Sequence, residues 1–360
     1  MTQRSENQTT AVDTVASLSD EEVAAEIRRL KAQLGGDLTI LGHHYQRDEI
    51  IQFADHRGDS LELSRVAANA RAKYIVFCGV RFMAETAAIL CDPQQIVVQP
   101  AEEALCPMAH LATAKEVADA WQALTAMWGD DLLPIVYQNS MAELKAFVGR
   151  HDGAVCTSSN ASKLFAWAWA HKGHILFTPD EHLGTNTALD MGVPLEEIGV
   201  WDRLHPPDPA TLRDCRVVVW KGYCYVHTGF TPQHVAEARS RYPDALIIVH
   251  PECPREVVAG ADASGSTSHI IRVVAEAEPG RTIVVGTECS LVHRLAHEHP
   301  DKQVVPLSER TCRTMSLTRM RDLLHVLQRI ASGQPDHIVT VDPETARWSR
   351  VALDRMLQAS

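Results

Sequence analysis

One unit of sequence occurs three times in this chain, at residues 38–79, 133–178 and 246–286. Each copy begins with a short run of mostly β-branched and aliphatic residues that ends abruptly in hydrogen-bonding side chains. A turn containing serine or threonine then opens a helical stretch, and a second strand-like run follows. This order is typical of strand-to-helix corners in parallel α/β units. We therefore expect an α/β protein of three related domains with parallel sheets.

Polar side chains follow the first strand of each unit. In open α/β sheets, ligands bind beyond the carboxyl ends of the strands. If the three domains face one another at these ends, the side chains share one cleft. The candidates are His43, His44, Tyr45, Tyr137, Asn139, His250 and Glu252.

Composition limits the classes of function. The chain has 360 residues, of which 45% are hydrophobic, so it can bury the cores of two or three domains. Its formal net charge is -12 and Lys and Arg do not cluster with aromatic residues, which argues against nucleic acid as a partner. No apolar stretch approaches the roughly twenty residues of a membrane span, and residues 1–18 lack the apolar core of a signal peptide. We expect a cytoplasmic protein without a membrane partner.

Helix signals and helix breakers suggest the domain limits. Ser19 has the pattern of an N-cap before an apolar stripe, and we expect residues 1–24 to form a flexible N-terminal tail. The proline-rich segment 204–209 is expected to connect the second and third units. Residues 315–330 have the periodicity of an amphipathic helix. The expected domains are 25–110, completed by C-terminal helices in 313–360, then 111–224 and 225–312.

The nine cysteines are the best candidates for metal chemistry. Their number is odd and no Cys-x-x-Cys occurs, so a disulfide framework is not expected and a metal site would be assembled from distant segments. Cys106, Cys224 and Cys312 lie in polar or turn surroundings, each near the end of one unit. These three are candidate metal ligands.

The remaining cysteines have simpler interpretations. Cys78 and Cys215 have apolar neighbours and are expected to be small core residues. Cys253 is the strongest rival ligand, because it precedes a proline as some iron–sulfur ligands do. Spacing alone leaves undecided Cys91, Cys156, Cys253 and Cys289.

Nine short motifs occur in a fixed order along the chain. They are Gly-His-His-Tyr (42–45), Gly-Asp-Ser (58–60), Phe-Met-Ala-Glu-Thr (82–86), Cys-Pro-Met-Ala (106–109), Asn-Ser (139–140), Cys-Thr-Ser-Ser-Asn (156–160), His-Pro-Glu-Cys-Pro (250–254), Gly-Ser-Thr (265–267) and Gly-Thr-Glu (286–288). Together they resemble, in order, the motifs of the quinolinate synthase family. The resemblance extends from about residue 25 to residue 330.

The resemblance implies three homologous αβα domains in a pseudo-threefold arrangement around a central cleft. It also implies one [4Fe-4S] cluster per chain, with Cys106, Cys224 and Cys312 as its three protein ligands. One iron would then be open to substrate and act as a Lewis acid. The chain departs from some family members because Arg, Thr and Met follow Cys312, which removes a local Cys-x-x-Cys.

The implied reaction condenses iminoaspartate with dihydroxyacetone phosphate to quinolinate, phosphate and water in de novo NAD biosynthesis. Iminoaspartate hydrolyses readily, so transient contact with an iminoaspartate-producing enzyme is also expected. Glu252 is the expected general base, and Tyr45, Tyr137 and His250 complete the catalytic set. The implied substrate contacts are His43, Ser60, Tyr137, Asn139, Ser158, His250, Glu252 and Thr267.

Two other classes of protein fit parts of the sequence. A sensor could hold a three-cysteine cluster without turnover, and it would not need acid and base groups such as Glu252 and Tyr45. A zinc or iron hydrolase would instead use a set of side chains at strand ends. That set is His43, His44, His250 and Glu252.

Some of these residues also have structural interpretations. His44 is expected to be the structural member of the pair at 43–44. Ser60, Ser158 and Thr267 would suit helix caps in any α/β protein. The residues with the pattern of a solvated helix face, to which we give no role, are His293, His297 and His299.

Overall fold

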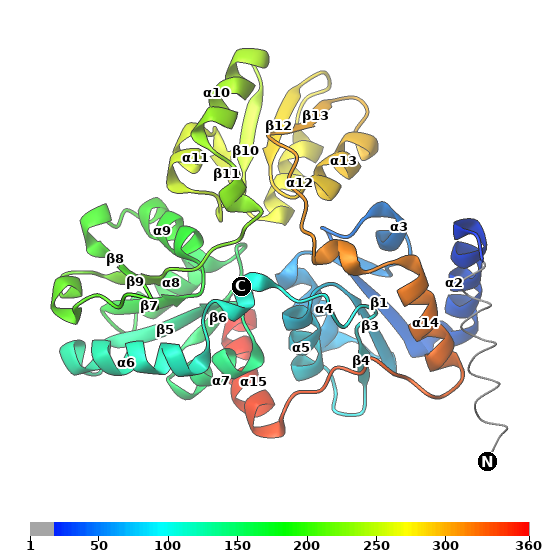
Figure 1. Cartoon of the computed structure of the whole chain (residues 1–360), viewed down its shortest axis with the longest axis horizontal. Coiled ribbons are helices and arrows are strands. Elements are labelled where there is room, and N and C mark those ends of the chain that lie inside the picture. Colours follow the sequence, from blue (N-terminus) through cyan, green and yellow to red (C-terminus); the bar gives the residue numbers. More distant parts are fainter. Residues whose placement is uncertain (1–17, 360) are drawn as a thin grey trace.

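The chain is an α/β protein with three sheets, seen in a computed structural model that describes residues 18–359 (Figure 1). All pairings between the named strands are parallel. Each sheet has helices packed on it, and Figure 1 shows the three resulting lobes. We call them the first, second and third lobes in chain order.

The first lobe has the strand order β2-β1-β3-β4. Ile40 packs with the N-terminal helix α2 and with α14, whereas Leu41 packs with α4 and α5 on the other face, because side chains alternate along a strand. The strands are β1 (Leu38–His43), β2 (His56–Gly58), β3 (Tyr74–Cys78) and β4 (Ile96–Val98). The helices are α2 (Asp20–Leu34), α3 (Asp48–Ile51), α4 (Ser60–Asn69), α5 (Arg81–Leu90) and, from the C-terminal region, α14 (Met320–Ala331).

The second lobe has the order β6-β5-β7-β9-β8. Segment 204–209 joins β8 to β9 inside this lobe, so its prediction as a connector to the third unit is wrong. The reason is that β9 pairs with β7 and β8 in the same sheet. The strands are β5 (Leu132–Tyr137), β6 (Ala154–Cys156), β7 (His174–Thr178), β8 (Ile198–Trp201) and β9 (Val217–Trp220). The helices are α6 (Ala114–Trp128), α7 (Ala142–Arg150), α8 (Ala161–Trp169) and α9 (Glu181–Asp190).

The third lobe repeats the four-strand order of the first, as β11-β10-β12-β13. Ile247 packs with α10 and α11, and Ile248 packs with α12 and α13 on the opposite face. The strands are β10 (Leu246–Val249), β11 (Ala263–Ser264), β12 (Thr282–Gly286) and β13 (Gln303–Pro306). The helices are α10 (Pro232–Arg241), α11 (Arg255–Gly260), α12 (Thr267–Glu276) and α13 (Cys289–Glu298).

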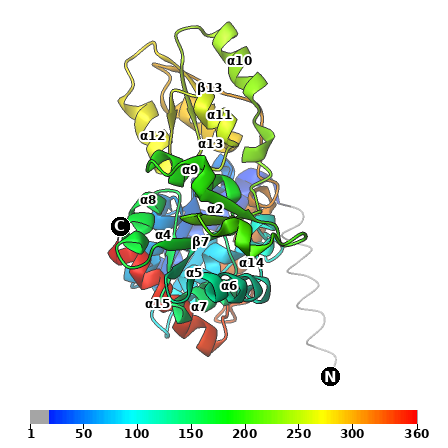
Figure 2. The same ribbon diagram turned by 90° about the vertical axis from the view of Figure 1, so that its left-hand side faces the viewer.

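The two C-terminal helices pack on different lobes. Helix α14 lies against α2, whereas α15 (Pro343–Gln358) lies mainly along α7 of the second lobe (Figures 1 and 2). The sequence predicts that both complete the first domain, but α15 carries a buried stripe that packs in the core of the second lobe. This stripe consists of Ala352, Leu353 and Met356.

The ends of several helices differ from the sequence expectations. Helix α2 begins at Asp20 with Ser19 in a capping box, so residues 20–24 of the predicted tail are helical, while residues 1–17 lie outside the described part. The helix expected over 315–330 begins at Met320, after a 3₁₀ turn. The 3₁₀ segments are η1 (Gly35–Asp37), η2 (Pro107–His110), η3 (Leu195–Glu197), η4 (Pro209–Leu212), η5 (His227–Gly229) and η6 (Met315–Leu317). Within residues 18–359, no helix combines the length and apolar character needed to cross a membrane.

Candidate active site

One cavity brings together every residue that the sequence analysis assigns to catalysis, substrate binding or the metal centre. Its lining comes from all three lobes, because each sheet contributes the carboxyl ends of its strands and the loops that follow. His44 is not among the lining residues, and its Nε2 lies 3.6 Å from Oε2 of Glu62. The predicted site residues in the lining are His43, Tyr45, Ser60, Cys106, Tyr137, Asn139, Ser158, Cys224, His250, Glu252, Thr267 and Cys312.

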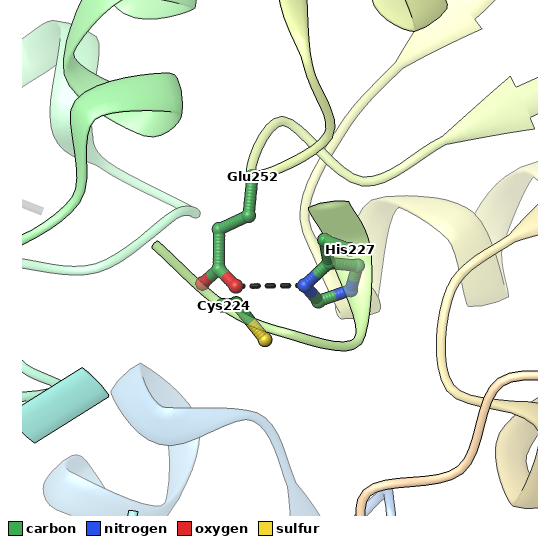
Figure 3. Close-up of side chains that lie close together, drawn as sticks. All are labelled: Cys224, His227 and Glu252. Carbon is green, nitrogen blue, oxygen red and sulfur yellow. Dashed lines mark hydrogen bonds and ion pairs between the residues drawn. The ribbon is translucent and has the colours of Figure 1, made fainter. Parts of the chain in front are cut away.

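Glu252 is the centre of a buried hydrogen-bond network. Its side chain is on the loop after β10, and the residue is only 2% exposed. The Tyr137 hydroxyl, at the end of β5, donates to Oε1 at 2.5 Å. Nδ1 of His227, beside Cys224, lies 2.7 Å from Oε2 (Figure 3). Both carboxylate oxygens therefore have a partner that the fold supplies from another segment.

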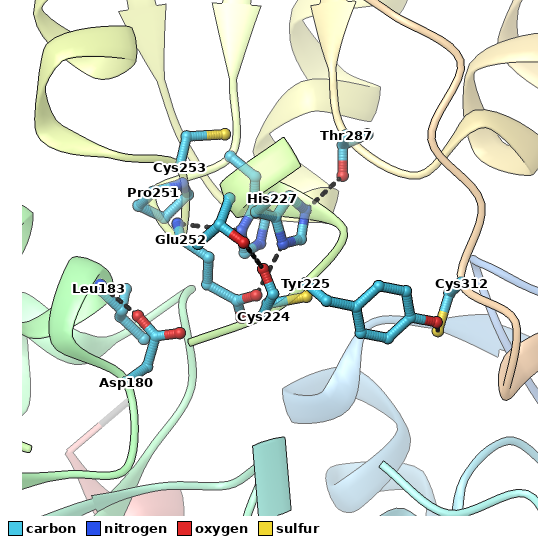
Figure 4. A network of polar contacts seen from close by, with 12 residues as sticks. Asp180, Leu183, Cys224, Tyr225, His227, Pro251, Glu252, Cys253, Thr287 and Cys312 are labelled. Carbon is cyan, nitrogen blue, oxygen red and sulfur yellow. Dashed lines mark hydrogen bonds and ion pairs between the residues drawn. The ribbon is translucent and has the colours of Figure 1, made fainter. Parts of the chain in front are cut away.

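The network continues from His227 to Thr287, which follows β12 (Figure 4). Nε2 of His227 lies 3.1 Å from Thr287 Oγ1, which lies 2.7 Å from the Tyr45 hydroxyl. Thr267 Oγ1 donates to the Tyr45 oxygen at 3.2 Å. Either oxygen can donate in the contact between Thr287 and Tyr45, and the roles of the His227 ring nitrogens depend on its tautomer. The side chains form a continuous series of polar contacts across the cavity wall.

Asp59 joins the three lobes at the helix-opening turns. Its Oδ2 accepts hydrogen bonds from Ser159 Oγ at 2.6 Å and from Ser268 Oγ at 2.7 Å. Its Oδ1 accepts from the N–H groups of Leu61 and Glu62 and so caps α4. One carboxylate therefore fixes the start of α4 and holds the corresponding turns of the other two lobes.

The N-caps at these turns are not the residues that the sequence predicts. Ser60 and Thr267 are the first residues of α4 and α12, and the N-caps are Asp59 and Ser266. Ser158 precedes α8, which starts at Ala161. None of the three predicted caps is thus an N-cap, which leaves their hydroxyls free of that structural duty.

The three predicted cysteine ligands differ in exposure from the other six cysteines. Cys106, Cys224 and Cys312 are partly exposed and line the cavity, whereas the others are buried. Each ligand candidate follows an equivalent strand, since Cys106 comes after β4, Cys224 after β9 and Cys312 after β13. The Cys253 rival has no measurable exposure and belongs to the third-lobe core.

Known proteins of one kind resemble this chain along most of its length. The family model described as quinolinate synthetase A protein matches residues 25–358. The quinolinate synthase of Bacillus licheniformis is 47% identical over 345 residues, which is 94% of each chain. That of Anoxybacillus flavithermus is 47% identical over 357 residues, or 97% of this chain and 96% of the relative. The chain belongs to the quinolinate synthase family. The family resemblance of the sequence motifs is confirmed.

Members of the quinolinate synthase family generally depend on an iron–sulfur centre, and the cavity offers suitable ligands. Within residues 18–359, Cys106, Cys224 and Cys312 do not form a group whose ligand atoms all lie within 4.8 Å of one another. A single ion needs such a group, because zinc–sulfur bonds are about 2.3 Å long. Three accessible thiols that are too far apart for one ion fit a larger inorganic centre.

Burial and hydrogen bonding set the protonation states of the cavity walls. Burial by itself raises the pKa of Glu252, but His227, His250 and the Tyr137 hydroxyl lower it to about 2. Burial lowers the pKa of His250 to about 3, to which nearby His227 contributes. Burial and the Glu252 charge raise the pKa of Tyr137 well above its usual range. At neutral pH a carboxylate therefore faces a neutral imidazole and a protonated phenol.

The structure adds residues that the sequence analysis did not assign. His227 stacks on His250, with ring centroids 4.4 Å apart, and its only local signal was its position three residues after Cys224. Asp59 and Thr287 lay within quoted motifs without a role. A close group of possible metal donors in the cavity combines Cys224, His227 and Glu252, so it shares Glu252 with the hydrolase alternative but none of the histidines of that alternative.

Proposed function

We propose that this chain is a quinolinate synthase that condenses iminoaspartate with dihydroxyacetone phosphate to quinolinate, phosphate and water. In this role it supplies the pyridine ring for de novo NAD biosynthesis. The proposal is supported by membership of the quinolinate synthase family. The structural observation that carries it is the convergence of the motif residues on one cavity around Glu252.

We further propose that the three lobes are homologous αβα domains around a pseudo-threefold axis, with the cavity as the central cleft. The shared strand order of the first and third lobes supports this, as does the same order within the five-stranded second sheet. The equivalent positions of Cys106, Cys224 and Cys312 after β4, β9 and β13 add support.

In this proposal Cys106, Cys224 and Cys312 hold one [4Fe-4S] cluster. When bound, such a cluster with one iron free of protein thiolate supplies Lewis-acid polarisation of substrate oxygen and nitrogen. Partial exposure of only these three cysteines within residues 18–359 supports their selection. Reduced thiols also suit a cytoplasmic location, which we propose for the enzyme.

Glu252 is the proposed general base, since its carboxylate is ionised, buried and oriented by two partners. Tyr137 is the proposed acid next to it, because its phenol keeps its proton at neutral pH. Tyr45 has the same protonation state for the same reason, burial, and would protonate or orient an intermediate from the first lobe. His250 is a neutral contact for a substrate oxygen.

Anion binding is proposed at the turns before α4, α8 and α12. Ser60 and Thr267 are the first residues of α4 and α12, where the helix dipole favours phosphate and carboxylate and their own hydroxyls do not cap the helix. Ser158, in the turn before α8, would bind an anion from the second lobe. His43 and Asn139, which also line the cavity, are proposed to contact substrate oxygens. Iminoaspartate is proposed to arrive by transient contact with the enzyme that produces it, without nucleic acid or membrane involvement.

The test is anaerobic purification with iron and sulfide analysis, followed by quinolinate detection after adding both substrates. We expect about four irons per chain, as a [4Fe-4S] cluster requires, together with quinolinate. A full cluster without quinolinate would favour the sensor alternative. A chain that binds no iron after reconstitution would contradict the three-cysteine assignment.

A further inference from the structure

A group of side chains that could bind a metal ion also lies outside the cavity. Cys289 and His293 are four residues apart on α13, so they project from the same face of that helix. Glu309 lies beyond β13, and Nε2 of His293 is 3.1 Å from its Oε1. The sulfur, a ring nitrogen and a carboxylate oxygen of these residues all lie within 4.8 Å of one another. None of them lines the cavity.

The donor set has the chemistry of a zinc site. Zn²⁺ binds thiolate, imidazole and carboxylate in tetrahedral geometry, and three protein ligands leave one position for water. Cys289 is 7% exposed, whereas the His293 and Glu309 side chains are 59% and 64% exposed. The sulfur thus forms the inner wall of the group, and the other two donors can adjust around an entering ion. Binding would release the thiol proton.

We propose that Cys289, His293 and Glu309 bind one Zn²⁺ ion, with water as the fourth ligand. This assigns a function to His293, which has only the pattern of a solvated helix face in the sequence. It also gives Cys289 a role distinct from the small core residues.

A competing group elsewhere is a poorer zinc site. It combines His325, Asp336 and His337 near the end of α14. The oxygen of Asp336 that lies 2.9 Å from His325 Nε2 also lies 3.0 Å from Nε of Arg329. The guanidinium already neutralises this carboxylate and repels an incoming cation.

A zinc ion at the proposed site would tether the segment that carries Cys312. The N–H of Cys289 donates to Arg310 O at 2.8 Å, and the N–H of Cys312 donates to Glu288 Oε1 at 3.3 Å. Glu309 begins the same segment, so its coordination to α13 adds a third connection beside these two. This consequence rests on the proposed role of Cys312 as a cluster ligand, whereas zinc binding itself does not.

The test is equilibrium dialysis of the anaerobically purified, cluster-loaded chain against buffered ZnCl₂, with zinc and iron measured by mass spectrometry. We expect one zinc per chain in addition to the iron. His293→Ala and Glu309→Ala, both at exposed side chains, should each weaken zinc binding by about 10-fold or more, since each removes a ligand. His297→Ala is the matched control, because this exposed histidine lies one turn further along α13 and should leave zinc binding unchanged.

A second measurement identifies the sulfur ligand. Co²⁺ substituted for zinc should add a thiolate-to-cobalt absorption band to the difference spectrum, and Cys289→Ser should abolish it. Equal zinc binding by the parent and His293→Ala, or absence of the cobalt band from the parent, would overturn the proposal. Zinc binding without iron or quinolinate would contradict the proposed function and leave the zinc site established.

Discussion

Tyr137, at the end of the second-lobe strand β5, donates its hydroxyl hydrogen to Oε1 of Glu252, which follows the third-lobe strand β10. The two residues are 115 positions apart, yet their 2.5 Å contact joins a proposed acid to a proposed base. His227 holds the other oxygen of the carboxylate at 2.7 Å. The position of Glu252 therefore depends on how two lobes meet.

Tyr137→Phe should lower kcat by roughly 100-fold, which is within the range for loss of an acid or base group. The ring remains, so the cavity keeps its shape and the iron content should not change. The measurement is quinolinate formation by the cluster-loaded chain under anaerobic conditions. Tyr242→Phe is the control, since this hydroxyl lies outside the cavity lining. Parent kcat in Tyr137→Phe would exclude the proposed role.

Cys224→Ala should strip most of the iron and abolish quinolinate formation, because it removes one of three proposed ligands. Cys215→Ala should retain both, since Cys215 is buried in the core of the second lobe. Iron per chain after anaerobic reconstitution distinguishes the two variants. Full iron loading in Cys224→Ala would mean that another side chain holds the cluster.

The paired change Ser159→Ala with Ser268→Ala should lower the free energy of unfolding by about 1–3 kcal/mol. Both hydroxyls donate to Oδ2 of buried Asp59, and their loss leaves this oxygen without its two partners from the other lobes. Anaerobic urea unfolding of the parent and variant measures the effect. Ser332→Ala, at an exposed position on the end of α14, should be nearly neutral. If the double variant loses no more free energy of unfolding than Ser332→Ala, the two hydrogen bonds to Asp59 do not stabilise the fold.

Lys145 should make stability depend on alkaline pH. The residue has no measurable exposure, its Nζ donates to Ser140 O at 2.7 Å, and burial lowers its pKa from 10.5 to about 8. Between these values the unfolded chain binds a proton that the folded chain lacks, so the free energy of unfolding rises with pH. The gain should be roughly 3 kcal/mol from pH 7 to pH 11, as the pKa shift implies.

Lys145→Met should remove this contribution, so the parent gains stability relative to the variant as the pH rises. The measurement is urea unfolding at several pH values. Lys115→Met, at an exposed position in α6, is the control. Its free energy of unfolding should change with pH in parallel to that of the parent. If the free energy of unfolding of Lys145→Met changes with pH in parallel to that of the parent, the pKa of Lys145 is not lowered in the folded state.

Gly149→Ala should destabilise the packing of α7 on α15. A Cβ at this position would lie 2.0 Å from the backbone oxygen of Trp348, so one helix must shift. We expect a loss of about 1–3 kcal/mol, the usual cost of overpacking, in thermal or urea unfolding. Gly36→Ala is the control, since its Cβ would meet no atom within 4 Å. If Gly149→Ala leaves the free energy of unfolding unchanged, α15 can shift on α7 without a cost in stability.

The local sequence predicted much of the fold. The period of apolar residues indicated the strands β1, β5 and β10, and Ser19 is the N-cap of α2 as its sequence pattern predicted. These features involve residues a few positions apart, whose geometry the backbone fixes directly. The prolines of segment 204–209 correctly indicated a loop. They could not show that this loop joins two strands of the second sheet and not two units.

The family motifs predicted more of the site residues than the spacing of the cysteines did. Spacing left several cysteines undecided, whereas the structure separates three partly exposed thiols from six buried ones. His227 was missed because one histidine near a cysteine has no distinctive local pattern. Its importance comes from contacts with Glu252 and Thr287, which follow β10 and β12.

Local sequence patterns are enough to predict the repeated parallel α/β units and the residue types at the ends of their strands. Three contacts arise only when distant segments pack together: Tyr137 meets Glu252, Asp59 joins three lobes, and α15 packs on α7. The difference lies in the range of the interactions. Strand period and helix caps depend on neighbouring residues, whereas these contacts depend on how separate apolar faces pack together.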